Sequence, residues 1–282
     1  MANGSYDASI YTDKKILYEI ERLRESVLYD VEIIEKCMDI LMCKKKKVLD
    51  IGCGPGATTK CILEKSGCAS VIGIDREIRF IENAKKEYGD LENISFTVSD
   101  VEHIPFEDNS VDICFSRYVF QHLRNPRKAL EEMIRVTKSG GTIGIYDWDE
   151  GLVKYSIIPQ NYDIYINAEN IRRRFTSGDI YMGRKVCNLF KICNIQDIRA
   201  YEFVKDTNNP GRQALWNGQK WMSKANEEHP YVKLGLMSIR QLEEYYTSLK
   251  KVFFDDESYV SYTDIFTVGK VYKEDSYVHK EV

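Results

Sequence analysis

The stretch Val48-Leu49-Asp50-Ile51-Gly52-Cys53-Gly54-Pro55-Gly56 decides the fold. A short, mostly apolar strand pattern runs into a turn with glycine at every second position, and a helical pattern starts directly after it. Glycine permits positive φ and lets a ligand come close to the backbone, and the first turn of the helix offers unpaired N–H groups. A dinucleotide-binding turn would read G-x-G-x-x-G, with room for a pyrophosphate. Here the pattern is D-x-G-x-G-x-G, and the acid disfavours a pyrophosphate but suits a ligand that carries a positive charge and an ammonium group.

Around this turn, short apolar runs alternate with helical patterns. We predict strands at 48–51, 70–74, 94–98, 111–115 and 142–146, and helices at 57–65, 78–88 and 126–137. Strands that are nearly continuous in apolar character are typical of parallel sheets covered on both faces. The sequence therefore predicts an α/β fold with a doubly wound, mostly parallel sheet, whose ligands bind at the carboxyl ends of the strands.

Polar residues stand at several of these strand ends. Asp75 ends the second strand, where a carboxylate can accept both hydroxyls of a ribose. Asp100 ends the third strand beside Val101, where it can take the amino group of an adenine or merely cap the following turn. Ser116 ends the fourth strand. A glycine turn alone is weak evidence, but this ordered set is much more specific.

These residues resemble those of the class I S-adenosylmethionine-dependent methyltransferases, over about residues 19–193. Two further segments, Ile104–Asp112 and Glu131–Gly141, are similar to the small-molecule branch that includes the ubiquinone- and menaquinone-biosynthesis methyltransferases. The resemblance implies a Rossmann-like sheet of seven strands with the last one antiparallel, and S-adenosyl-L-methionine as the cofactor. It implies that the cofactor is bound by Asp50, Gly52, Cys53, Gly54, Asp75, Arg76, Asp100, Val101 and Ser116.

Some of these positions have a structural alternative, and two others depart from the family. Asp50 can be a buried acid that backbone N–H groups satisfy, and Cys53 fills a position of the turn that many residue types occupy. Ser139 stands where relatives usually have proline in a turn before the fifth strand. Arg79 stands where they usually have an apolar residue, and it lies either near the adenine or on the helix surface.

Methyl transfer from a sulfonium is an in-line displacement, so the protein mainly positions the acceptor and, where required, removes a proton. No metal is needed. Candidate groups follow the fourth strand, in residues 117–122, and the fifth, in residues 146–150. His122 can act as a general base or can hold its loop through a backbone hydrogen bond. Tyr118, Asp147 and Asp149 are further catalytic candidates, and the two aspartates can instead cap the strand end.

The remaining segments predict a core with a helical lid. We expect an N-terminal helical cap at 1–46, the cofactor-binding core at 47–206, a helical lid insertion at 207–258, and a final strand and tail at 259–282. Residues 151–182 show no clear periodicity, and we expect them to be irregular. The insertion carries Trp216, Trp221, Tyr245 and Tyr246, which can cover an aromatic or amine acceptor. Alternatively, the tryptophans only anchor the insertion to the sheet.

Composition argues against several classes of partner and binding site. The 282 residues include 40 Lys and Arg against 44 Asp and Glu, a net charge of −4 that argues against nucleic acid as the main partner. No run approaches about 18 consecutive apolar residues, so we expect no membrane span. The first residues do not have the pattern of a signal peptide. The eight cysteines form no C-x-x-C pair, which favours reduced thiols in the cytoplasm and suggests no metal site.

We therefore expect an enzyme, a monomer or homodimer that transfers a methyl group to O, N or C of a small-molecule acceptor. The alternative is a protein that binds S-adenosylmethionine without methyl transfer, as a sensor or scaffold or for other sulfonium chemistry.

Overall fold

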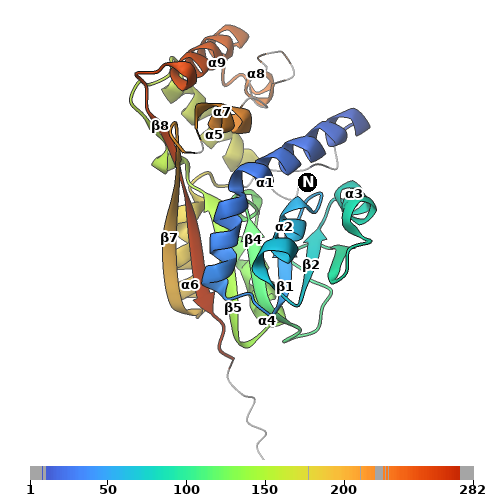
Figure 1. The fold of residues 1–282 in the computed structure, drawn as a ribbon. Helices are drawn as coiled ribbons and strands as arrows, with labels where there is room; N and C mark the ends of the chain where they lie inside the picture. Colours follow the sequence, from blue (N-terminus) through green and yellow to red (C-terminus); the bar gives the residue numbers. More distant parts are fainter. Residues whose placement is uncertain are drawn as a thin grey trace, which may run out of the picture.

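The computed structural model describes residues 8, 11–176, 178–209, 211–219, 225, 227 and 229–273, so that Trp221 lies outside the described residues. These residues form one mixed sheet of eight strands (Figure 1). Across the sheet the order is β3 (Ile94–Val98), β2 (Ser70–Asp75), β1 (Lys47–Ile51), β4 (Val111–Arg117), β5 (Thr137–Trp148), β8 (Val260–Lys270) and β6 (Lys154–Tyr155), and β7 (Gln196–Asp206) also pairs with β8.

The direction of the strands confirms the predicted fold class. The first five strands of that order are parallel, and β8 is antiparallel to β5, β6 and β7. The resemblance implied seven strands. The eighth is β6, a two-residue strand that pairs with Val260 and Ser261 at the start of β8.

Helices cover both faces of the sheet. Alternate side chains of a central strand point to opposite faces, so one strand contributes to a core on each side. In β1, Val48 packs in a core with residues of α1 (Asp13–Leu41), α2 (Ala57–Ser66) and α3 (Ile78–Tyr88). The next residue, Leu49, packs in a second core with α4 (Pro126–Val136) and α6 (Met182–Ile192). Both side chains are fully buried, as expected for a strand between two layers.

The longest described helix, α1, packs on the sheet with its second half and on α3 with its first half (Figure 1). Its second half packs on the sheet through Ile34, Met38 and Leu41, whereas Ile16 and Ile20 in its first half pack with Phe80 of α3. Among the helices that the structure describes, none has the length and apolar character needed to cross a membrane.

A third core lies beyond the carboxyl ends of the strands (Figure 1). It is formed by α5 (Tyr162–Thr176), α7 (Arg212–Gln219), α8 (Pro230–Lys233) and α9 (Ile239–Phe254), which we call the helical cover. Tyr165, Leu242, Tyr245 and Phe253 are among its buried members. The cover therefore has its own apolar interior and stands over the edge of the sheet at which ligands bind in this fold.

The expectation of irregular structure at 151–182 was wrong, because α5 is a helix of 15 residues. Its buried residues are Tyr165, Ala168 and Glu169, so a charged residue takes the place of part of the apolar stripe. The carboxylate of Glu169 is paired with Arg172 and Arg173, each at 2.7 Å. Such a helix lacks the aliphatic periodicity by which helices are recognised in sequences.

Candidate active site

One large cavity opens at the carboxyl edge of the sheet, between the first half of α1 and the helical cover. Its volume is about 680 Å³, within the range of about 300–1,000 Å³ typical of ligand sites. One side, which we call the glycine-turn side, includes Gly52, Gly54, Asp75, Asp100 and Val101. The other, which we call the aromatic side, includes Trp148, Glu150, Tyr155, Tyr165, Tyr245 and Tyr262.

The glycine turn is shaped by residues that pack closely against it, from the segment after β4 and from β3. Gly52 has a φ of +67°, and a Cβ atom built there would lie 2.3 Å from Cγ2 of Val119. Gly56 has a φ of +86°, and a Cβ there would lie 2.8 Å from the ring of Phe96. Both positions therefore require glycine on two counts, conformation and space. The turn thus brings its backbone to the cavity wall without side chains in between.

Asp75 ties the end of β2 to this turn. One carboxylate oxygen accepts the N–H of Gly54 and the other that of Glu77, each at 2.9 Å. Burial raises the pKa of Asp75, and the two N–H donors oppose that rise. The carboxylate is therefore fixed in orientation on the cavity wall, and its remaining lone pairs can accept hydroxyl donors.

Asp50 and Ser116 lie behind the wall rather than on it. Asp50 is 1% exposed and accepts a hydrogen bond from the hydroxyl of Thr59 at 2.6 Å. Burial raises its pKa to about 7. Ser116 is fully buried on β4, next to Ile51 of β1, and within the described chain its hydroxyl has no partner.

Two other predicted cofactor residues do line the cavity. Cys53 is 4% exposed, and burial raises its pKa well above the usual value, so it is a thiol and not a nucleophilic thiolate. Arg76 is exposed at the mouth of the site.

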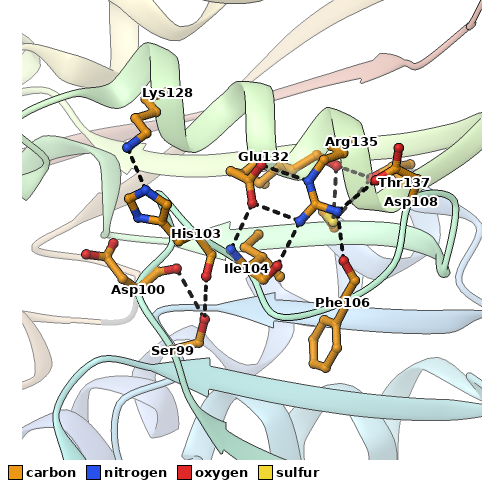
Figure 2. A network of polar contacts seen from close by, with 12 residues as sticks. Ser99, Asp100, His103, Ile104, Phe106, Asp108, Lys128, Glu132, Arg135 and Thr137 are labelled. Carbon is orange, nitrogen blue, oxygen red and sulfur yellow. Dashed lines mark hydrogen bonds and ion pairs between the residues drawn. The ribbon is translucent and has the colours of Figure 1, made fainter.

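The loop after β3 carries Asp100 and Val101 and is fastened from behind. Figure 2 shows the guanidinium of Arg135, from α4, donating to the carbonyl oxygens of Ile104 and Phe106, each at 2.7 Å. Asp100 itself accepts the N–H of Glu102 at 2.9 Å, so its side chain does cap the turn. Its carboxylate is exposed at the cavity and can accept a further donor there.

Tyr118 anchors a buried polar network beside the cavity. Its φ is +57°, which is rare for a bulky residue. Its hydroxyl donates to Asp264 at 2.7 Å and accepts from Lys205 at 2.8 Å, and Arg117 pairs with Asp30 in the same network. Burial and the charge of Asp264 raise the pKa of Tyr118 well above its usual value. Its hydroxyl therefore stays protonated.

His122 sits at the end of the short turn Phe120–His122 and lines the cavity. Its Nδ1 lies 3.4 Å from a guanidinium nitrogen of Arg173. Burial and the charges of Arg173 and Arg172 lower the pKa of His122 well below the usual value. The imidazole is neutral at neutral pH and is a weak base.

Asp147 and Asp149 are fully buried, and the described cavity wall does not include them. Asp147 accepts the backbone N–H groups of Gln121, at 3.1 Å, and Trp148, at 2.9 Å. Asp149 forms a two-point ion pair with Arg184, with contacts of 2.6 and 2.7 Å. Both acids hold the loops after β4 and β5 in place.

Sequence reasoning included Glu150 in the candidate segment 146–150 without singling it out, and it is the acid of that segment that lines the cavity. Glu150 accepts a hydrogen bond from the indole N–H of Trp148 at 2.9 Å, and both residues line the wall. Tyr245 was predicted as a cover aromatic and lies on the wall, whereas Trp216 packs on Phe253, with 5.6 Å between ring centres. The period of two along an extended chain was the available signal, since it sends residues 148 and 150 to one side and 147 and 149 to the other.

Comparison with known proteins agrees with this geometry. Residues 49–145 match the methyltransferase domain family. An uncharacterized methyltransferase of Schizosaccharomyces pombe is 33% identical over 130 residues, which cover 43% of this chain and 45% of that protein. A demethylmenaquinone methyltransferase of Paenarthrobacter aurescens is 31% identical over 121 residues, again 43% of this chain and 45% of the relative. The chain thus spans less than half the length of these curated relatives.

Among solved structures, the YcgJ protein of Bacillus subtilis has the same fold. It superposes with a TM-score of 0.54 at 19% identity, and the match covers 85% of this chain and 98% of that one. The matched residues 49–145 contain the glycine turn, Asp75, Asp100 and the end of β4. Residues 49–145 are therefore a class I S-adenosylmethionine-dependent methyltransferase domain.

Proposed function

We propose that this protein is an enzyme that transfers a methyl group from S-adenosylmethionine to O, N or C of a small molecule. The observation that carries the proposal is the single cavity that joins the glycine turn to the aromatic side under the helical cover. A methyl donor held at one side and an acceptor held at the other share one cavity, so the two reactants can be held close together and aligned for an in-line transfer.

On this proposal the glycine-turn side holds the cofactor. Asp75 accepts the ribose hydroxyls, the backbone of Gly52, Cys53 and Gly54 lies against the amino acid part, and Asp100 and Val101 contact the adenine. Arg76 borders the ribose. When bound, the cofactor supplies a methyl group on a positively charged sulfur that is a good leaving group. Asp50 and Ser116 act from behind the wall, where the Asp50–Thr59 contact supports the turn.

The predicted catalytic residues take positioning roles in this proposal. Tyr118 and His122 line the cavity after β4, and their pKa shifts leave both uncharged. They shape the space in which the acceptor meets the methyl group. Asp147 and Asp149 fix the loops that carry Gln121 and Glu150.

We extend the proposal to the division of the chain and its setting. Residues 47–206 with 259–282 bind the cofactor, and residues 1–46 and 207–258 close over the acceptor. All eight cysteines are free, which supports a reducing cytoplasmic setting, and the net charge of −4 supports a partner other than nucleic acid.

The test has two steps. Calorimetry with S-adenosylmethionine and S-adenosylhomocysteine measures cofactor binding, and release of S-adenosylhomocysteine is then followed with a panel of amine, hydroxyl and carbon acceptors. The proposal expects tight binding of both cofactor forms and release that depends on one acceptor class. Binding without acceptor-dependent release across the panel would favour a sensor or scaffold.

A further inference from the structure

The aromatic side of the cavity gathers rings from distant parts of the chain around one acid. Trp148 ends β5, Tyr155 lies in β6, Tyr165 in α5, Tyr245 in α9 and Tyr262 in β8, and all five line the cavity together with Glu150. The rings also pack on one another. Tyr165 and Tyr245 are stacked with 4.1 Å between centres, and Trp148 lies 5.2 Å from Tyr262.

Within the described part of the chain, Glu150 has one hydrogen-bond donor and no cation paired with it. The indole N–H of Trp148 reaches one carboxylate oxygen at 2.9 Å. In the part of the chain that the structure describes, no Lys, Arg or His lies within ion-pair distance of this carboxylate. This contrasts with Asp149, one residue earlier, which has Arg184 at 2.6 Å.

The charged residues near Glu150 do not neutralise the charge of its carboxylate. Glu169 also lines the cavity, but Arg172 and Arg173 are both paired with it at 2.7 Å. Arg173 lowers the pKa of Glu150 less than Glu169 raises it. Burial, with the charge of Glu150 contributing, raises the pKa of the cavity tyrosines, so they remain neutral. Among the described residues on this side, Glu150 is therefore the negative charge that no cation compensates.

A buried carboxylate with a single donor is costly unless a cation pairs with it. The cost is visible here, since burial raises the pKa of Glu150 to about 7. The faces of Trp and Tyr rings attract cations through their quadrupole, and aromatic cages of this kind recognise organic ammonium groups. A neutral aromatic acceptor would use the rings and leave the carboxylate unpaired. An anionic acceptor would be repelled.

We propose that the acceptor is an organic amine that binds as its ammonium ion, with Glu150 as its counter-ion and the rings of Trp148 and Tyr245 against its alkyl groups. Before transfer the carboxylate of Glu150 takes the ammonium proton, which frees the nitrogen lone pair to accept the methyl group, and S-adenosylhomocysteine is the leaving group. This inference rests on the proposed function and narrows it to nitrogen-containing acceptors.

The experiment compares a cation with a neutral molecule of the same shape. Choline and 3,3-dimethylbutan-1-ol are titrated by calorimetry into the full-length protein saturated with S-adenosylhomocysteine. We expect choline to bind at least about tenfold more tightly, since the two differ in charge alone. Equal affinities, or no binding of choline, would overturn the inference.

The variant Glu150→Gln removes the charge and keeps an oxygen that can accept from Trp148. We expect it to fold, to bind S-adenosylhomocysteine as the wild type does, and to lose the preference for choline. Glu102→Gln is the matched control, because Glu102 also lines the cavity but on the glycine-turn side. A choline preference that survives in Glu150→Gln, or that falls equally in both variants, would contradict the role of Glu150.

Two changes at Tyr245 test the ring. Tyr245→Phe keeps an aromatic face and should keep the preference, whereas Tyr245→Leu should reduce it several-fold. The cofactor titration separates the two proposals. Failure to bind S-adenosylhomocysteine would remove the proposed function, whereas normal binding without a choline preference would remove only the amine acceptor.

Discussion

The glycine-turn side of the cavity is built from backbone groups and strand ends within residues 50–101, whereas the aromatic side is built from side chains that span residues 148–262. On the first side, Asp75 fixes the turn through the N–H of Gly54, and Arg135 fixes the loop after β3. On the second, rings from a β-strand pair and two helices pack on one another. A site made of main-chain groups tolerates little change, whereas a site made of packed side chains can be altered one ring at a time.

Gly52→Ala is the substitution that we expect to disrupt the glycine-turn side most. The added Cβ would lie 2.3 Å from Cγ2 of Val119 at a φ of +67°. Val119 is β-branched and stiff, so the turn itself must move. We expect a loss of about 2–5 kcal/mol in unfolding free energy, from about 1–2 kcal/mol for the backbone and about 1–3 kcal/mol for the overlap. Thermal and denaturant unfolding measure this loss, and calorimetry should show at least about a hundredfold weaker cofactor binding.

Gly140→Ala is the matched control. Gly140 has a φ of +80°, but a Cβ there would meet no atom within 4 Å. This variant should lose only the backbone contribution and bind the cofactor normally. If both variants were destabilised equally, the contact with Val119 would not constrain the turn.

Asp75→Ala is the next largest change on the same side. It removes the acceptor that we assign to the ribose hydroxyls, worth about 1.5–3 kcal/mol, or about ten- to a hundredfold in affinity for S-adenosylmethionine. Asp206→Ala is a fitting control, because Asp206 likewise accepts two backbone N–H groups, those of Asn208 and Asn209, but lies outside the cavity wall. Unchanged calorimetric affinity in a folded Asp75→Ala protein would rule out the ribose assignment.

The two sides also differ in how far the sequence predicts them. Gly52 and Asp75 could be predicted, because each sits where a strand ends, and the order of strands can be read from local apolar patterns. Asp147 and Asp149 were placed at the correct strand end, but the alternation of side chains turns them away from the cavity. Glu150 was part of the same candidate segment, and it was not singled out because that alternation was not applied to the segment.

The aromatic side could not be predicted in the same way. Its tyrosines converge through the packing of the helical cover on β6 and β8, and no local pattern encodes that convergence. The helix α5 was missed because Glu169 interrupts its buried stripe. The structure of the aromatic side therefore depends on tertiary packing and paired charges. The structure of the glycine-turn side follows from local periodicity and can be predicted from the sequence.

A buried acid behind the glycine turn allows a test by pH. The pKa of Asp50 is raised from 3.8 to about 7 in the folded protein, so between these values the folded chain binds more protons than the unfolded one. Asp50 therefore lowers the free energy of unfolding as pH rises from about 4 to 7. Asp50→Asn, which can still accept from Thr59, should stabilise the cofactor-free protein by at most about 4 kcal/mol at pH 8 and hardly at all at pH 4.

Asp112→Asn should do the opposite. The pKa of Asp112 is lowered because Lys138 and the N–H of Lys47 hydrogen-bond to it, so its carboxylate stabilises the fold above pH 4. Chemical denaturation at both pH values measures the two variants. Equal stability of Asp50→Asn and wild type at pH 8 would mean that Asp50 is ionised at little cost.

The smallest expected effect is the pH dependence of choline binding on the aromatic side. It compares Glu150, which lies on the cavity wall, with Asp50, which is buried behind it. Choline carries a permanent charge, so the pH dependence of its binding reports only on the protein. Glu150 becomes ionised as pH rises through about 7, and choline affinity should therefore increase about tenfold between about pH 6 and pH 8.

The other groups around Glu150 do not produce this change. The pKa of Glu169 is lowered to about 2 by Arg172 and Arg173, so this acid carries its charge throughout, and Asp149 is paired with Arg184 and lies off the cavity wall. The pKa of His122 is lowered far enough to keep it neutral, and the tyrosines titrate well above this range. Glu150→Gln should therefore bind choline weakly and without dependence on pH. A variant that kept the wild-type slope would assign the titration to another group, and the acid on the aromatic side would then be as structural as the one behind the glycine turn.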